Sequence, residues 1–182
     1  MVAVYKCRSS FEDNRPQIDF QMPSNSRNDW LMIGNVENGS VDIAQWPRNV
    51  ALWVNVDQVS DWDCFMVPGT KSLYSQRFVH VVGKRSLERF VLLPVQLNGV
   101  TYYFLRNREA VDCFDRQKAV YETFPHDLSR VMRIRQFAFV ANFVPQDACF
   151  CIPETRALLL TGPVANRIRD AGLRGIHLQQ IR

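Results

Sequence analysis

Residues 158–182 read LLLTGPVANRIRDAGLRGIHLQQIR, and this stretch predicts a strand, a helix and a second strand in succession. Thr161 or Gly162 suits the N-cap of the helix, and Pro163 suits its first turn because a missing N–H costs nothing there. Gly172 is the expected C-terminal stop, since glycine readily adopts the left-handed conformation that ends many helices. The chain is therefore expected to close with a strand–helix–strand unit.

The two faces of this closing unit differ in polarity. Helical spacing gives the helix one apolar stripe for burial, made of Val164, Ile168 and Ala171. Leu173 to Ile181 then reads as the closing strand, with Ile176 or Leu178 filling the core. The polar side of the unit is expected to expose three arginines, namely Arg167, Arg169 and Arg174.

Strand signals dominate the rest of the chain. Asn98-Gly99 lies between two apolar runs, which predicts a β-hairpin. Residues 131–144 are expected to be extended, and residues 115–130 to form a loop with one helical turn at most. Trp53 is expected in the core. The expected strands are Met1–Cys7 at a sheet edge, Ile18–Met22, Trp30–Ile33, Val50–Val56, Phe90–Val95, Ala110–Phe114 and Ala148–Ile152.

A second short helix is expected at residues 76–82, where Ser75 is a good N-cap and Gly83 ends the helix. Its buried side is expected to hold Phe78, Val81 and Val82. The order of elements here is a strand, a hydroxyl cap, a short helix and a strand, and the same order occurs at the C-terminus. This repetition fits either a duplicated unit or a common layout. The fold class expected from these elements is α+β, a mostly antiparallel sheet with a few short packed helices. It would form one domain, with residues 1–45 as a smaller N-terminal subregion.

Composition limits the classes of protein that this chain can be. Of 182 residues, 47% are hydrophobic and 22% charged, which supports a buried core. The net charge of +4 is a mild excess and not that of a nucleic-acid polycation. The five cysteines are odd in number and irregularly spaced, which favours free thiols in a reducing compartment. No signal peptide is visible and no apolar run approaches the roughly 20 residues that span a bilayer, so a cytoplasmic protein without membrane contact is expected.

A set of short motifs follows in a characteristic order from Trp46 onward. They are Trp46-Pro47, Leu73-Tyr74-Ser75-Gln76-Arg77-Phe78, Val91-Leu92-Leu93-Pro94-Val95, Val111-Asp112-Cys113-Phe114-Asp115, Cys149-Phe150-Cys151-Ile152-Pro153, and Leu160-Thr161 through to Leu178. In this order and spacing, residues 46–182 resemble the bacterial immunity-protein family eleven of polymorphic toxin systems. The chain departs from the family's pattern at three polar positions, which are Gln76, Ala119 and Cys151.

The resemblance implies a small cytoplasmic protein that is made beside a toxin, binds that toxin and blocks it. It implies no chemistry and no cofactor of the protein's own. Two surfaces are candidates for the contact. Asp61, Trp62 and Asp63 offer an aromatic anchor between carboxylates for a toxin with a basic cleft, although Trp62 could equally be a partly buried side chain that closes a loop. The basic face of Arg167, Arg169 and Arg174 would suit an acidic toxin instead.

Two thiol clusters raise the possibility of chemistry. Asp112 and Cys113 with His126 would suit a small cytosolic enzyme with a Cys–His nucleophile, whereas the alternative is a core thiol beside aspartates that cap a turn. Cys149 and Cys151 share one face of a strand and would suit zinc if Cys113, His126 or His177 lay nearby. Structural zinc sites usually show two separated ligand pairs, so no metal is expected.

A basic and aromatic stretch raises the possibility of an RNA-associated binding module. Its members are Arg130, Arg133 and Arg135, followed by Phe137 and Phe139. Arginines beside stacking aromatics are typical of single-stranded nucleic-acid surfaces. The same pattern also fits a strand with an exposed basic face and a buried aromatic one, so nucleic acid is not the expected partner.

Overall fold

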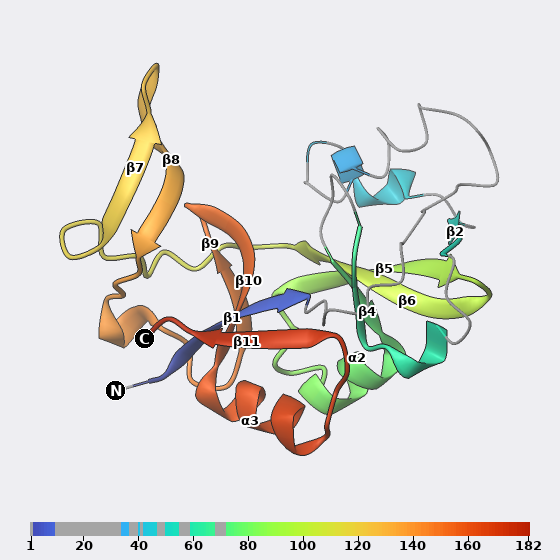
Figure 1. Cartoon of the computed structure of the whole chain (residues 1–182). Coiled ribbons are helices and arrows are strands. Elements are labelled where there is room, and N and C mark those ends of the chain that lie inside the picture. The colour runs from blue at the N-terminus through green and yellow to red at the C-terminus, as the bar shows by residue number, and fades with distance from the viewer. Residues whose placement is uncertain are drawn as a thin grey trace.

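The computed structural model of the chain describes residues 2–9, 34–36, 40, 42–46, 50–54, 59–67 and 72–182. Within these ranges the fold is α+β, with mostly antiparallel sheets and short helices, as the sequence predicts (Figure 1). The helices of this part of the chain are all too short or too polar to cross a membrane. The strands expected at residues 18–22 and 30–33 lie outside the described residues, as does most of the expected N-terminal subregion.

A five-stranded sheet is built around the predicted hairpin. Asn98 and Gly99 form its turn with φ angles of 48° and 80°, the left-handed values that a two-residue hairpin turn requires. The Asn98 side chain also accepts a hydrogen bond from the Val54 N–H and donates one to the Val54 carbonyl, at 2.9 and 2.7 Å. The sheet runs in the order β2-β5-β6-β4-β3, with β2 (Ala51–Leu52), β5 (Phe90–Leu97), β6 (Val100–Asn107), β4 (Ser72–Ser75) and β3 (Cys64–Met66).

A four-stranded sheet joins the two ends of the chain. It runs in the order β11-β1-β10-β9, with β11 (Ile176–Gln180), β1 (Val4–Ser9), β10 (Thr155–Thr161) and β9 (Cys149–Ile152). The prediction that the N-terminal strand lies at a sheet edge is therefore wrong. β1 pairs on both sides, and it buries Val4 on one face and Cys7 on the other.

The two helices follow β4 and β10 directly. α2 (Gln76–Val82) begins as predicted, because the Ser75 hydroxyl accepts the Phe78 N–H at 3.0 Å, and it ends at Gly83 with φ 85°. It buries Phe78, Val79 and Val82, so Val79 takes the place expected for Val81. α3 (Gly162–Asp170) buries Val164, Ala165 and Ile168, whereas Ala171 is the half-buried C-cap. The phase of both helices is thus predicted correctly at two of three positions.

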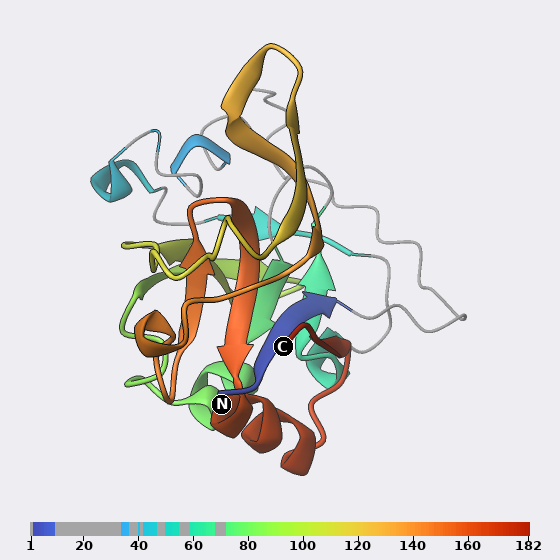
Figure 2. The ribbon, with the colours of Figure 1, turned by 90° about the vertical axis from the view of Figure 1, so that its left-hand side faces the viewer.

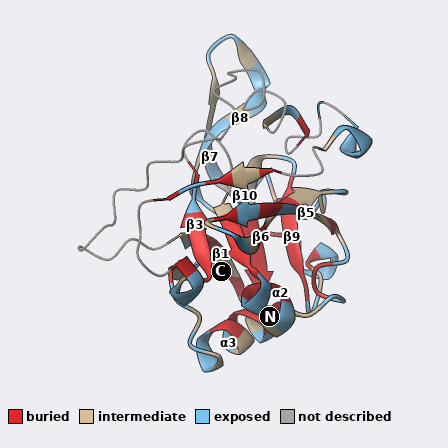
Figure 3. Ribbon diagram, turned by 90° about the vertical axis from the view of Figure 1, so that its right-hand side faces the viewer, coloured by how far each residue is buried: buried red, intermediate tan, exposed pale blue. Residues whose placement is uncertain are grey.

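The helices cover one face of each sheet. Their buried side chains share a single cluster with Tyr74 of β4, Cys7 of β1 and Cys149 of β9. A second cluster lies on the other face of the five-stranded sheet, and a third lies on the other face of the four-stranded sheet. Buried residues accordingly concentrate in the strands of the two sheets and in the inner faces of the helices (Figure 3).

The two sheets share one topology. In the first, β3 and β4 form an antiparallel pair, α2 follows, and β5 returns parallel to β4 with β6 between them. In the second, β9 and β10 form the antiparallel pair, α3 follows, and β11 returns parallel to β10. The strand between β10 and β11 is β1, from the opposite end of the chain. The repetition seen in the sequence therefore extends to the strand order.

The sequence and register of the two units also match. Cys64-Phe65-Met66-Val67-Pro68 corresponds to Cys149-Phe150-Cys151-Ile152-Pro153. The buried residues of α2, Phe78, Val79 and Val82, correspond to Val164, Ala165 and Ile168 of α3 at a constant offset. That offset is one residue larger than the offset between the two cysteines, and the register shift in β10 between Thr155 and Leu159 accommodates the extra residue. These matches favour an internal duplication over a coincidental layout.

Of two strand predictions near the middle of the chain, the one at residues 50–56 is confirmed in part and the one at residues 110–114 is wrong. Within residues 50–56, β2 is formed and Trp53 makes a β-bridge, whereas residues 55–56 lie outside the described part. Trp53, expected in the core, is 53% exposed because Leu52 and Val54 point inward and side chains alternate along an extended chain. Residues 110–114 form no strand, and their single bridge joins Phe114 to Phe139.

The loop expected at residues 115–130 contains instead a β-hairpin that projects from the body of the molecule (Figures 1 and 2). It consists of β7 (Val120–Phe124) and β8 (Asp127–Gln136), which pair only with each other. We call it the hairpin arm. None of the residues of the arm is fully buried, and the pairing register of β7 with β8 shifts three times. The two strands therefore do not show the alternation of buried and exposed side chains that is typical of a strand in a packed sheet. The extended stretch expected at 131–144 ends at Gln136, and Ala141–Phe143 is a 3-10 helix.

All five cysteines are buried free thiols. Burial raises the pKa of Cys7 to about 12 and that of Cys113 to about 11, and it raises the pKa of Cys64 and Cys149 well above their usual range. We therefore expect a thiol reagent at pH 8 to react slowly with the native chain, since the thiolate is the nucleophile. In denaturant without reductant, the same titration should return all five thiols. Recovery of three would reveal a disulfide.

Candidate functional site

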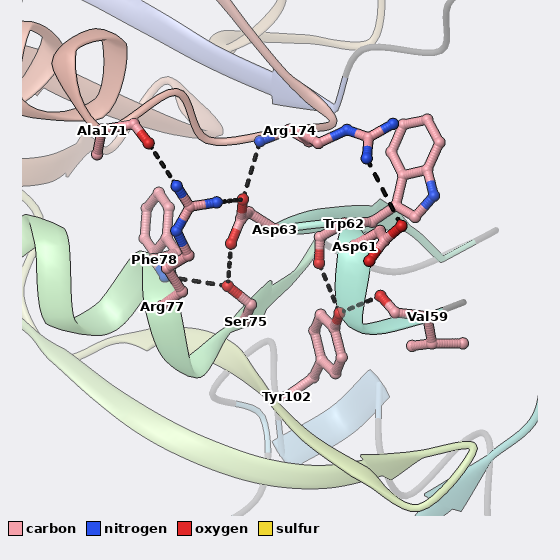
Figure 4. A network of polar contacts seen from close by, with 10 residues as sticks. All are labelled: Val59, Asp61, Trp62, Asp63, Ser75, Arg77, Phe78, Tyr102, Ala171 and Arg174. Atoms are coloured by element: carbon pink, nitrogen blue, oxygen red, sulfur yellow. Dashed lines mark hydrogen bonds and ion pairs between the residues drawn. The ribbon is translucent and has the colours of Figure 1, made fainter.

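The Asp61-Trp62-Asp63 segment lies where the 3-10 helix Val59–Asp61 leads into β3, against the loop that follows α3 (Figure 4). Its members differ in exposure: Asp61 is exposed, Trp62 is half-buried, and Asp63 is only 2% exposed. The expectation that both carboxylates flank an exposed anchor is therefore wrong for Asp63. The side chain points inward because it continues the pairing of β3 with β4 and meets the N-cap of α2.

Asp63 is the centre of a polar network that joins the two units. Its carboxylate accepts hydrogen bonds from the Ser75 hydroxyl at 2.6 Å, from the Arg174 N–H at 2.8 Å and from the Arg77 guanidinium at 3.2 Å. Its own N–H donates to the Arg174 carbonyl, and its carbonyl accepts from the Ser75 N–H. Every polar group of this buried residue is thus paired within the fold. Asp63 holds the loop after α3 onto the start of α2.

Trp62 and Arg174, predicted on alternative surfaces, touch each other. The Arg174 guanidinium carbon lies 5.3 Å from the centre of a Trp62 ring, and a guanidinium nitrogen lies 3.7 Å from a carboxylate oxygen of Asp61. Gly175 permits this closeness: it has φ 78°, and an added Cβ would lie 2.7 Å from the Cys64 carbonyl oxygen. The acidic and basic candidate surfaces therefore meet in one contact that largely neutralises its own charge.

Arg167 is likewise occupied within the fold. Its guanidinium pairs with Asp147 at 2.8 Å and donates to the Ser86 hydroxyl and to the Val82 carbonyl at the end of α2. The hydrogen bond from Arg167 is the main cause that lowers the pKa of Asp147. The prediction that Arg167 is a freely exposed cation is wrong, because the side chain is half-buried in this network. Arg169 is exposed and lies over the Tyr5 ring at 4.5 Å.

The Arg77 and Arg167 contacts are reciprocal, although the two arginines do not occupy matching positions of α2 and α3. Arg77 of α2 donates to the carbonyl of Ala171, at the end of α3, just as Arg167 of α3 donates to that of Val82, at the end of α2. Cations are favourable at helix C-termini, where carbonyl groups lack partners. Each helix thus supplies the arginine that satisfies the end of the other. The sequence contains both arginines, but their pairing depends on the packing of one helix on the other.

The candidate catalytic residues do not form a reactive constellation. Cys113 is buried, and desolvation, Glu154 and Asp112 raise its pKa, so the thiol is stabilised as the protonated form. Asp112 is exposed, and His126 lies at the exposed turn of the hairpin arm, whereas Cys113 is buried in the third core cluster. Asp115 accepts hydrogen bonds from the backbone of residues 117 and 118, which is the turn-capping alternative.

The candidate zinc thiols are core side chains. Cys149 and Cys151 share the face of β9 that packs against the helices, whereas Phe150 and Ile152 occupy the other face. His177 is exposed on β11, and Cys113 belongs to a different cluster from Cys149. Across the described ranges, no group of three or more His, Cys, Asp or Glu side chains is placed to hold a metal ion.

A groove lies between the four-stranded sheet and the foot of the hairpin arm. It has a volume of about 430 Å³ and is lined by four cationic side chains, which are Lys6, Arg8, Arg133 and Arg135. No carboxylate of the described residues lines it. We call it the basic groove. Arg135 pairs with Glu122 of β7, whereas the other three cations form no ion pair with another described residue.

The basic groove combines residues that the sequence analysis singled out with others that it missed. Arg133, Arg135 and Phe137 belong to the predicted basic and aromatic stretch, but Arg130 lies over Phe124 in the hairpin arm and Phe139 is buried. Lys6 and Arg8 were missed. Their alternation with buried Cys7 places both on one face of β1, and this signal was available in the sequence. No family model matches this chain, and no curated protein matches it either.

Proposed function

We propose that this chain is a binding protein that neutralises a cognate bacterial toxin by covering it, as the resemblance to immunity proteins implies. The observation that carries the proposal is the hairpin arm, which leaves the body of the molecule and pairs only with itself (Figure 2). Tyr121 and Ile134 pack the hairpin arm against the third core cluster, whereas much of β8 is exposed. Because the two strands of the arm are already paired, a partner could bind their side chains with little further loss of conformational entropy.

The exposed apolar side chains of the hairpin arm support this proposal. Leu128 is 74% exposed, Met132 49% and Val120 48%, and Phe143, in the 3-10 helix after the arm, is 62% exposed. Scattered exposed apolar residues are normal, but several on one protrusion are typical of an interaction site. Leucine and methionine lose contact with water when a partner covers them, which supplies binding free energy.

We therefore place the proposed toxin contact on the hairpin arm and not on the Asp61-Trp62-Asp63 segment. Asp63 is bound within the fold and Trp62 stacks with Arg174, so these two side chains could meet a partner only by leaving stabilising contacts. By contrast, Leu128 and Met132 of the hairpin arm pack against none of the core clusters of the described residues. A toxin bound there would be blocked by occlusion, and the proposed function requires no catalytic group.

The proposal predicts how surface variants behave beside the toxin encoded next to this chain. That toxin alone should stop bacterial growth, and the wild-type chain should restore growth and co-purify with it. Leu128→Ser with Met132→Ser should weaken the complex at least about tenfold, since hot-spot truncations commonly cost over 1 kcal/mol. The matched control is Met66→Ser with Val100→Ser, which changes two exposed apolar residues of the body.

Two results would contradict the proposal. One is full affinity in the arm variant, and the other is rescue of growth without co-purification. The second result would indicate an enzymatic antidote.

A further inference from the structure

We infer that the basic groove binds an acidic polypeptide segment, with carboxylates spaced along an extended chain. The inference rests on the proposed function in one respect, because it supplies the chemistry of the partner surface that meets this face. The groove is lined in part by residues 133–136 of β8, at the foot of the hairpin arm, so one partner could contact both. The charges and shape of the groove itself favour this ligand.

The charge of the groove is uncompensated. Lys6 and Arg8 rise from one face of β1, and Arg133 faces them from β8. None of these three has a carboxylate partner among the described residues, although the chain as a whole carries 18 acidic residues. Like charges held close together repel, and an anion that binds between them relieves this repulsion.

The surroundings of Lys6 also favour a bound anion. Burial and then the nearby Arg8 lower its pKa, so its ammonium is less favourable in the groove than in water. The ammonium also lies 6.0 Å from the centre of the Phe137 ring, which is a weak substitute for an anion. A carboxylate placed beside Lys6 would favour its charged form. The groove is thus arranged for a negative group that the described residues do not supply.

The polar lining favours a polypeptide over a nucleic acid. Three glutamines share the groove with the cations, namely Gln136, Gln179 and Gln180. The Gln180 amide already accepts from the Tyr5 hydroxyl and donates to the Arg182 carbonyl, but the amides of Gln136 and Gln179 can both donate to and accept from a peptide backbone. Single-stranded nucleic acids need free aromatic faces for stacking. Among the described residues of the groove lining, Phe137 is the one aromatic, and its ring already stacks on Phe139, with centroids 5.9 Å apart and an interplanar angle of 16°.

The size of the groove suits a short segment. At about 430 Å³ it falls within the range of typical ligand sites and admits a few side chains, but it does not form a long track along the surface. A duplex or a long single strand would require basic residues beyond the groove. A loop or an extended terminus with several carboxylates would fill it.

The test measures binding of a fluorescein-labelled hexaglutamate peptide and of an oligouridylate of equal charge, by anisotropy at low salt. The full chain is compared with Arg8→Glu plus Arg133→Glu. The matched control is Lys84→Glu plus Arg108→Glu, two exposed cations outside the groove that give the same change in net charge. We expect the groove variant to raise the Kd for the peptide at least about tenfold and the control to leave it within about twofold.

Three outcomes would overturn the inference: no peptide binding by the wild-type chain, equal losses in both variants, or tighter binding of the oligouridylate that the groove variant abolishes. The last outcome would assign the groove to nucleic acid. Thermal melts of both variants verify that each is folded.

The arm variant Leu128→Ser plus Met132→Ser separates this inference from the proposed function. It should bind the peptide as the wild-type chain does. If the groove binds the peptide but no toxin is captured, the proposed function fails and the inference stands. If the toxin is captured equally by wild type and groove variant, the inference fails and the proposed function stands.

Discussion

Asp63→Ala is expected to destabilise the fold by about 3 kcal/mol, because it removes a buried acceptor of three hydrogen bonds. The Ser75 hydroxyl and the Arg174 N–H would lose their partner where water has little access, since the Asp63 side chain is 3% exposed. The Arg77 side chain is 54% exposed, so the ion pair with Arg77 is screened by solvent and contributes the smaller share.

Chemical denaturation measures this loss, and Asp61→Ala is the matched control. Asp61 lies two residues away, and among the described residues its side chain pairs with the exposed Arg174 alone, at 3.7 Å, so its replacement should cost under about 0.5 kcal/mol. Similar small losses from both variants would mean that the Asp63 network adds little to stability. Asp63 would then be available for a role at the surface, contrary to its observed burial.

Asp63 also shows what the sequence could not reveal about this site. Its neighbours Asp61 and Trp62 suggest a polar loop, and an aspartate in such a loop is usually exposed. The partners that bury it, Ser75 and Arg174, are 12 and 111 residues away. No local pattern carries that information. The inward direction of Asp63 follows from the pairing of β3 with β4 and from the packing of the loop after α3.

Elements with strong local signals were predicted well. The Asn98-Gly99 turn, the Ser75 cap of α2 and the proline-led start of α3 each depend on contacts within a few residues. The hairpin arm had the opposite character. Its strands bury no complete apolar face, although Tyr121 and Ile134 pack against the third core cluster, so the sequence of β7 and β8 resembles that of a loop.

The basic groove was half visible in the sequence. Arg133 and Arg135 stood out because they alternate beside phenylalanines, and Lys6 and Arg8 alternate in the same way about Cys7. The two pairs of cations lie in one groove because β1 lies inside its sheet, next to the C-terminal strand β11. A strand that pairs across nearly the whole length of the chain has no nearby sequence signal for its partners.

Ile168→Ala is expected to cost about 2–5 kcal/mol, through lost burial and the cavity that remains. Ile168 is 2% exposed and lies in the cluster that α3 shares with α2 and both sheets. The site has little freedom to collapse, because Arg167 and Arg77 hold the end of each helix to the other. A value near the upper end of the range is therefore expected.

Asn166→Ala is the matched control in the same helix. Asn166 is exposed and its side chain accepts a hydrogen bond only from Arg169, so the cost should stay under about 0.5 kcal/mol. Equal and small losses from the two variants would mean that α3 packs with a different phase. The duplication adds a further check on that phase: Val82 occupies the matching position of α2, and Val82→Ala should cost less than Ile168→Ala because it removes one methylene less.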